Sequence, residues 1–131
     1  MATVPLIAEE AAPAEVKAVY DDIKSRRGVD RINNFWKALA NDPANLARFW
    51  EDMQRVMGKG ALDPLVKELI YVAVSITNNC EYCIHSHTAA ARQRGLTDEQ
   101  YREFLAVIGL AARANALVTA MKVPVDQQYL V

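Results

Sequence analysis

Two cysteines and a histidine in the segment CEYCIHSH, residues 80–87, are the side chains of this chain best suited to redox chemistry. If the segment begins a helix, Cys80, Cys83 and His87 share one face, because residues three and four apart are neighbours on a helix. The first turn of a helix favours an anion, and the thiols of a C-x-x-C pair there ionise readily. His87 can give or take a proton within reach of Cys83. The spacing therefore predicts a redox-active thiol pair beside a proton carrier.

Glu68 is the fourth candidate, because it is a carboxylate inside the otherwise apolar segment LVKELIYVAV. Burying a carboxylate without a partner lowers the stability of the folded state, so we expect Glu68 either to be paired or to have a functional role. Glu68 lies twelve residues before Cys80, and a chain that turns back on itself would bring it beside the cysteine pair. We expect burial to raise the pKa of Glu68, which would let it shuttle protons.

Several other sites fit parts of this pattern. Haem attachment needs a histidine directly after the second cysteine, where this chain has Ile84, and is excluded. A structural zinc site would use the two cysteines and His87 with His85 or Glu68, but the usual second ligand pair is missing. Two buried cysteines acting as small apolar side chains beside a surface histidine remain an alternative. His85 points away from the reactive face, so we expect it to be exposed.

The elements that must position these residues are predicted to be helices. Asp-Pro pairs at 42–43 and 63–64 are typical of helix starts, and the second precedes LIYVAVSIT, which we therefore expect to be an enclosed helix despite its β-branched residues. Asn78 or Asn79 is expected to cap the cysteine helix. A capping box, Thr97 with Gln100, begins the last long helix. The sequence predicts an all-α, single-domain bundle of five to six helices that spans residues 1–131.

Two further groups of side chains lie outside the cysteine motif. The stripe Phe49, Trp50, Met53 and Met57 is best explained as core packing, with a subunit interface or a pocket wall as the alternatives. We expect arginines 92 and 94 to lie on a solvated face.

Composition and charge narrow the classes of protein. The 131 residues are 52% hydrophobic, which suffices for one core, and the net charge of −1 counts against generic nucleic-acid binding. No uninterrupted apolar run reaches the roughly 18 residues of a membrane span, and the amino end has no signal-peptide pattern. We expect a cytoplasmic protein without nucleic-acid or membrane partners. The high apolar share beside 24% charged residues predicts a symmetric homo-oligomer.

The pattern E-x11-C-x2-C-x3-H formed by Glu68, Cys80, Cys83 and His87 resembles the signature of the alkylhydroperoxidase D branch of the carboxymuconolactone decarboxylase-like family. The resemblance covers roughly residues 40 to 120, and residues 1–39 would be an N-terminal helical extension. It implies an all-helical fold and assembly as a trimer or hexamer. By position, Cys83 resembles the peroxide-reactive cysteine that passes through a sulfenic acid, and Cys80 resembles its proton donor and resolving partner. Glu68 and His87 resemble the proton relay.

The resemblance implies a thiol-dependent alkyl hydroperoxide reductase that acts on an organic hydroperoxide, needs an external dithiol or disulfide reductase and uses no cofactor. One alternative is a redox-sensing or metal-binding helical module that does not turn over. Another is a decarboxylase-type lactone enzyme, although that branch lacks the cysteine pair. The family's best-known member has a histidine between its cysteines, where this chain has Tyr82, whose phenol has an ordinary pKa of about 10.

Overall fold

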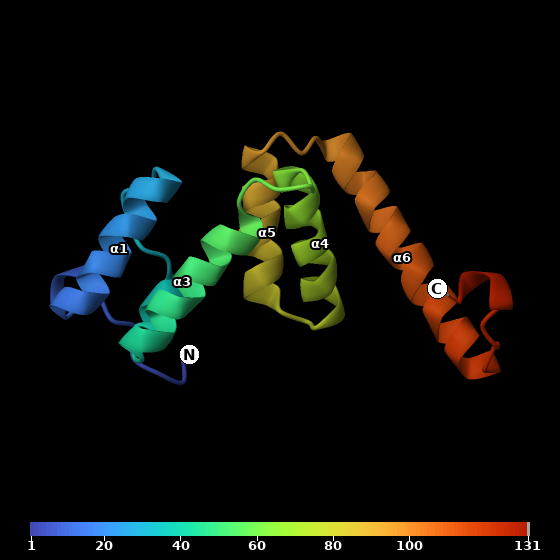
Figure 1. Cartoon of the computed structure of the whole chain (residues 1–131), viewed down its shortest axis with the longest axis horizontal. Coiled ribbons are helices and arrows are strands. Elements are labelled where there is room, and N and C mark those ends of the chain that lie inside the picture. The colour runs from blue at the N-terminus through green and yellow to red at the C-terminus, as the bar shows by residue number, and fades with distance from the viewer. Residues whose placement is uncertain (131) are drawn as a thin grey trace. The chain divides into compact units, whose positions relative to one another are not determined.

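The computed structural model describes residues 1–130, and every regular element in that range is helical (Figure 1). Two 3-10 turns, η1 and η2, flank six α-helices. The elements in chain order are η1 (Glu9–Ala11), α1 (Ala14–Arg27), α2 (Asn34–Leu39), α3 (Pro43–Met57), α4 (Pro64–Thr77), α5 (Glu81–Gln93), α6 (Asp98–Met121) and η2 (Gln127–Tyr129). The prediction of an all-α protein with five to six helices is confirmed, and the β-branched segment after Pro64 is the helix α4.

Local sequence signals set several of these boundaries. Asp42 and Asp63 each accept a backbone hydrogen bond from the first turn of α3 and α4, and each is followed by proline at the first helical position. Thr97 and Gln100 make both bonds of the predicted capping box at the start of α6. Gly28 ends α1 with φ of 63°, in the left-handed region that glycine adopts without strain.

The junction between α4 and α5 differs from the expectation that an asparagine caps the cysteine helix. Asn78 ends α4, and Asn79 has φ of 54°, a left-handed conformation that asparagine tolerates better than most residues. Cys80 is the N-cap of α5, and its backbone N–H donates to the carbonyl of Ser75 at 2.9 Å. The chain therefore reverses within three residues, and α5 begins at Glu81.

The contacts of the chain group into two compact units, Met1–Gly58 and Lys59–Val131. In the first unit α1, α2 and α3 surround a buried core formed by Val16, Tyr20, Ile23, Ile32, Trp36, Ala40, Leu46 and Trp50. Phe49 and Met53 pack against that core, and the rings of Trp36 and Trp50 meet edge to face with centroids 5.4 Å apart. Core packing of the stripe on α3 is thus confirmed for these residues, while Met57 is half-buried outside the cluster.

In the second unit α4 and α5 form a hairpin in which the two helices pack side by side (Figure 1). The hairpin buries Val72 and Ala91, together with the polar side chains of Glu68 and Ser75. The hydroxyl of Ser75 donates to the carbonyl of Tyr71 at 2.7 Å, so its burial costs little. This hairpin carries all four side chains that the sequence singles out.

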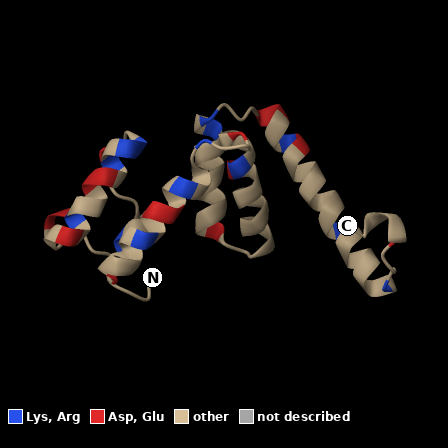
Figure 2. Cartoon of the chain, viewed as in Figure 1, with Lys and Arg blue, Asp and Glu red and all other residues tan. Residues whose placement is uncertain are grey.

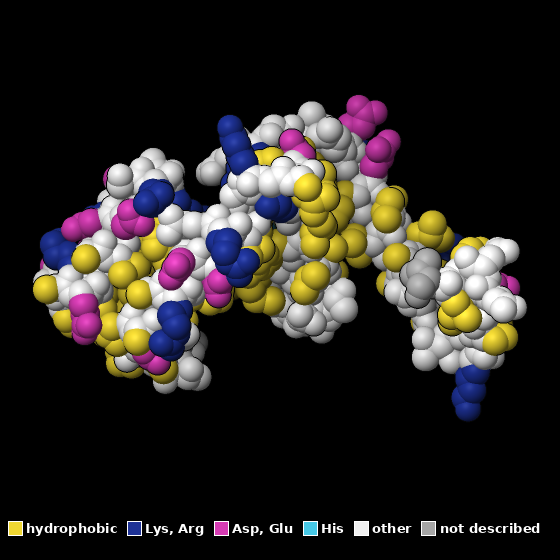
Figure 3. Space-filling model, in the orientation of Figure 1, with side chains coloured by type: hydrophobic (Ala, Val, Ile, Leu, Met, Phe, Trp, Pro, Cys, Tyr) yellow, Lys and Arg dark blue, Asp and Glu magenta, His cyan; other side chains and the backbone are white. Residues whose placement is uncertain are grey.

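Helix α6 buries none of its residues within this chain. Its residues 104–121 contain a single charged side chain, Arg113 (Figure 2). By length and composition it is the one helix among residues 1–130 that could cross a membrane, with a mean hydropathy of 1.7 over 18 residues. The expectation that no uninterrupted apolar run reaches about 18 residues holds for this helix, because Arg113 and Asn115 interrupt the stretch and only its mean hydropathy is high. Apolar side chains also lie at the surface of α4 (Figure 3).

Candidate active site

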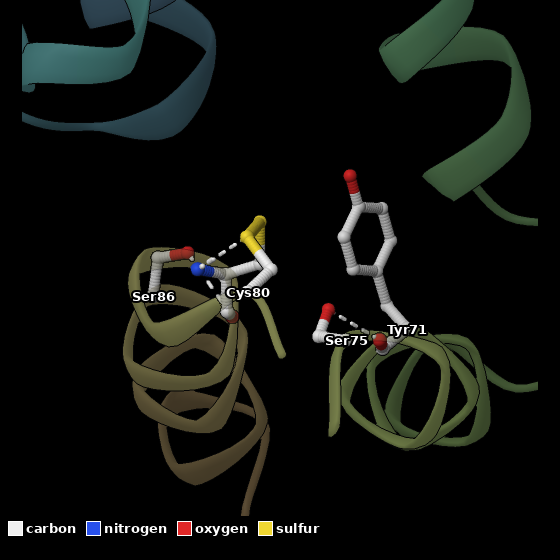
Figure 4. Close-up of a disulfide and its surroundings, with 5 residues drawn as sticks. Tyr71, Ser75, Cys80 and Ser86 are labelled. Atoms are coloured by element: carbon white, nitrogen blue, oxygen red, sulfur yellow. Dashed lines mark hydrogen bonds between the residues drawn. A yellow bond between two sulfur atoms is a disulfide. The ribbon is translucent and has the colours of Figure 1, made fainter. Parts of the chain in front are cut away.

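Cys80 and Cys83 are joined by a disulfide at the start of α5, opposite Tyr71 and Ser75 of α4 (Figure 4). Their Cα atoms are 5.3 Å apart. Sγ of Cys80 accepts the backbone N–H of Cys83 at 3.3 Å, so this sulfur occupies the N-cap place of the helix. When the disulfide opens, the same donor and the helix dipole would stabilise a thiolate at Cys80. The predicted bond is confirmed, whereas its reversibility stays a prediction.

The hairpin brings Glu68 of α4 against His87 of α5. Oε2 of Glu68 lies 2.7 Å from Nδ1 of His87, and the two side chains are only 5% and 14% exposed. An ionised carboxylate has no proton to donate, so Nδ1 must carry the hydrogen and donate it. The neutral imidazole then keeps its acceptor lone pair on Nε2. Among residues 1–130 the side-chain hydrogen bond of His87 is the one between Nδ1 and Glu68.

The second carboxylate oxygen of Glu68 is held by Arg94, the residue that ends α5. Nε of Arg94 lies 3.2 Å from Oε1 of Glu68, and the arginine side chain is 41% exposed. The expectation that Arg94 lies on a solvated face is therefore only half right, because one edge of its guanidinium pairs with a buried carboxylate. Arg92 does belong to the surface, where it pairs with Asp98 at 2.6 Å.

The pKa of Glu68 is lowered from its ordinary value of 4.5, contrary to the expected rise. Burial is the largest single influence and raises this pKa, but the hydrogen bonds and charges of His87 and Arg94 together outweigh it. The apolar neighbours of Glu68 can be read from the sequence, whereas its contacts with His87 and Arg94 depend on how α5 packs against α4. Glu68 is thus a stable anion at neutral pH, suited to orienting His87 rather than to carrying a proton itself.

Tyr71 of α4 covers one face of the His87 imidazole. The two rings are stacked, with centroids 3.6 Å apart and planes inclined by 18°. The contact restrains rotation of the imidazole, while the Glu68 carboxylate sets the direction of its Nδ1. Together they hold His87 in one orientation, one helical turn beyond Cys83.

The geometry resembles that of known proteins. A sequence model of the carboxymuconolactone decarboxylase family matches residues 43–126. The chain belongs to this family. The fold also matches a crystal structure described as the alkylhydroperoxidase AhpD core of Rhodospirillum rubrum. The two chains are 60% identical and superpose with a TM-score of 0.95, over 100% of this chain and 98% of the chain in the crystal structure.

Curated relatives add names within the carboxymuconolactone decarboxylase family. The alkyl hydroperoxide reductase AhpD of Azorhizobium caulinodans is 29% identical over 122 residues, which are 89% of this chain and 62% of that relative. An uncharacterized protein of Cupriavidus necator is 36% identical over 87 residues, 66% of this chain and 75% of that relative. The resemblance to the alkylhydroperoxidase D branch that the motif predicted is confirmed by these matches.

The structure brings the predicted residues of this family member onto one hairpin as two linked pairs. The cysteines form one pair and Glu68 with His87 the other, and no hydrogen bond joins the two pairs within residues 1–130. His85 is exposed, as predicted. In the part of the chain that the structure describes, no group of three or more His, Cys, Asp or Glu side chains is arranged to hold a metal ion.

Sequence reasoning missed two members of this site, Tyr71 and Arg94. Both follow a predicted residue at helical spacing: Tyr71 is three residues after Glu68, and Arg94 is seven after His87. That periodicity places each on the reactive face of its helix. It could have nominated them, although it could not say which groups they contact.

Proposed function

We propose that this chain is a thiol-dependent alkyl hydroperoxide reductase, with Cys80 and Cys83 as the redox pair and Glu68 with His87 managing the protons. The observation that carries the proposal is the disulfide at the start of α5, on the same hairpin as the buried Glu68–His87 pair. The relatives named alkyl hydroperoxide reductase support it. This chain covers 62% and 54% of those two relatives, so their activity is taken over here only as a proposal.

In the first step the Cys83 thiolate attacks one oxygen of the hydroperoxide ROOH, and the O–O bond breaks. The alkoxide leaves with the bond's electron pair and takes a proton, which Nε2 of a protonated His87 can supply. The products are the alcohol ROH and a sulfenic acid on Cys83. Cys83 is assigned this role because His87 lies one turn away on the same face of α5.

In the second step the Cys80 thiolate attacks the sulfenic sulfur of Cys83. The S–O bond breaks, hydroxide leaves and takes a proton to become water, and the disulfide forms. The Cys83 N–H that caps Cys80 stabilises the attacking thiolate until the bond closes. An external dithiol or disulfide reductase then returns two electrons and two protons, so no bound cofactor is required.

The proposal extends to assembly and compartment. The apolar side chains exposed on α6 and α4 favour a homo-oligomer, trimeric or hexameric as the family resemblance implies. A disulfide that must be reduced in every cycle fits a cytoplasmic protein, because thiol reductants keep that compartment reducing.

Peroxide consumption tests the function directly. The full chain is incubated with cumene hydroperoxide and excess dithiothreitol, and the equivalents of peroxide consumed per subunit are counted. The matched control is the double variant Cys80→Ser, Cys83→Ser. We expect many equivalents for the wild type and only the background rate for the control.

Two outcomes would contradict this proposal. Consumption that stops after about one equivalent, although reductant remains, would indicate a redox sensor. Lactone decarboxylation that survives alkylation of both cysteines would indicate the decarboxylase chemistry of the wider family.

A further inference from the structure

We propose that Arg94 is a positioning residue, which grips one carboxylate oxygen of Glu68 so that the other is presented to Nδ1 of His87. This arrangement leaves Nε2 of His87 as the proton-exchanging atom of the site. The inference deepens the proposed function, on which its catalytic meaning rests. Its structural content, the dependence of the Glu68–His87 pair on Arg94, can be tested without any turnover.

Two side chains from α5 and its C-cap, His87 and Arg94, contact the carboxylate of Glu68 on α4. We call this arrangement the carboxylate clasp. His87 lies on α5 and Arg94 is the C-cap of that helix, seven residues later, and seven residues are close to two helical turns. Their side chains reach the same carboxylate of α4 from two levels, at 2.7 Å and 3.2 Å. Each oxygen of Glu68 is therefore engaged by a different donor, and rotating the carboxylate would break both contacts at once.

The two contacts of the carboxylate clasp matter because Glu68 is buried. Glu68 is 5% exposed, so water cannot readily replace a lost partner. Among residues 1–130 the charged groups that act on Glu68 are His87 of α5 and Arg94, the C-cap of α5. Of these, Arg94 alone keeps its charge whatever the protonation state of His87. Without Arg94, a neutral His87 would leave the buried carboxylate without a cationic partner.

The consequence for His87 is a fixed tautomer. Near neutral pH an ionised Glu68 accepts the Nδ1 hydrogen in both protonation states of the imidazole, so proton exchange takes place at Nε2. Arg94 acts through Glu68 and through no direct contact with His87. It is consequently distinct from the groups that would touch the peroxide.

Nuclear magnetic resonance of the imidazoles and carboxylates tests the proposal on the full chain. The chain has two histidines, so the exposed His85 provides an internal reference. In Arg94→Gln we expect the Hδ1 proton of His87 to exchange with solvent about tenfold faster or more, since a charge-assisted network has lost one member. The titration midpoint of the Glu68 carboxylate should move upward. Arg94→Lys should bring both quantities part of the way back to their wild-type values, because it returns the positive charge without the planar guanidinium.

Arg92→Gln is the matched control, because Arg92 is an arginine of the same helical turn whose partner is the exposed Asp98. It should leave the Hδ1 exchange and the Glu68 midpoint unchanged. If Arg94→Gln kept the wild-type Hδ1 exchange rate of His87 and the wild-type titration midpoint of Glu68, the proposal would be overturned. Because neither measurement requires peroxide turnover, the inference would stand or fall independently of the reductase activity. If the activity is present, Arg94→Gln should lower it by about tenfold to a hundredfold, the range for partners that orient a reactive imidazole.

Discussion

Nδ1 of His87 lies 2.7 Å from Oε2 of Glu68, although the two residues are 19 positions apart and belong to different helices. A carboxylate that accepts the Nδ1 hydrogen fixes the tautomer and the orientation of an imidazole. In this chain His87 belongs to α5, the helix that begins at the cysteine pair. The relationship makes Glu68 and His87 the most informative positions to change.

Replacing Glu68 by glutamine should reduce peroxide turnover at neutral pH by about 10²-fold or more, because the anion that orients His87 is lost. The free energy of unfolding should fall by about 1–3 kcal/mol, since the contacts to His87 and Arg94 lose their charge assistance. Enzyme assays and chemical denaturation of one preparation measure both quantities. Glu51→Gln, an exposed change on α3, is the control. Full turnover in Glu68→Gln would end the role assigned to this carboxylate.

Acid should destabilise the wild type more than Glu68→Gln. The folded chain holds the pKa of Glu68 below its ordinary 4.5, so the unfolded chain binds this proton more readily. The stabilising contribution is fully present above the unfolded pKa and is lost as the pH falls through the folded value. Denaturation curves from about pH 6 to about pH 3 should show the two variants converging. Parallel curves across that range would mean that Glu68 titrates normally.

The two cysteines should differ in their reaction with peroxide. In Cys80→Ser, peroxide should produce a sulfenic acid at residue 83 that dimedone traps, because His87 lies one turn from that sulfur. In Cys83→Ser, residue 80 should trap poorly. Mass spectrometry of the adducts distinguishes the two. The opposite pattern would reassign the roles, and it would agree with the N-cap hydrogen bond that favours a thiolate at Cys80.

Light scattering at micromolar concentration should give a mass that is a multiple of the subunit mass. Helix α6 buries none of its residues, with Val107 63% and Leu110 59% exposed, and an extended exposed apolar surface marks an interaction site. Leu110→Glu should weaken the association, and Glu103→Gln on the same helix should not. A monomeric wild type would contradict the prediction.

The sequence predicts what depends on neighbours along the chain. The Asp-Pro starts of α3 and α4 and the capping box of α6 are short-range patterns, and the structure has all three. The shared face of Cys80, Cys83 and His87 likewise follows from helical spacing alone. These features could be predicted because each is decided within one or two helical turns.

The features that the sequence did not predict depend on contacts between helices. Whether Arg94 meets Glu68 or solvent is decided by the register in which α5 packs on α4, and no local pattern encodes that register. The wrong direction expected for the pKa of Glu68 has the same origin. The left-handed Asn79 was missed because several residues of the junction could have capped α5, and the hydrogen bond from Cys80 to Ser75 selects one of them.

The three-residue junction between α4 and α5 has a consequence for how the protein folds. Every side chain of the site, from Glu68 to Arg94, lies in this single reversal of the chain or on the segments that directly flank it. Closing so short a loop costs little entropy, and local contacts of this kind form early in folding. The reactive centre can thus take shape while the rest of the chain is still emerging or unfolded.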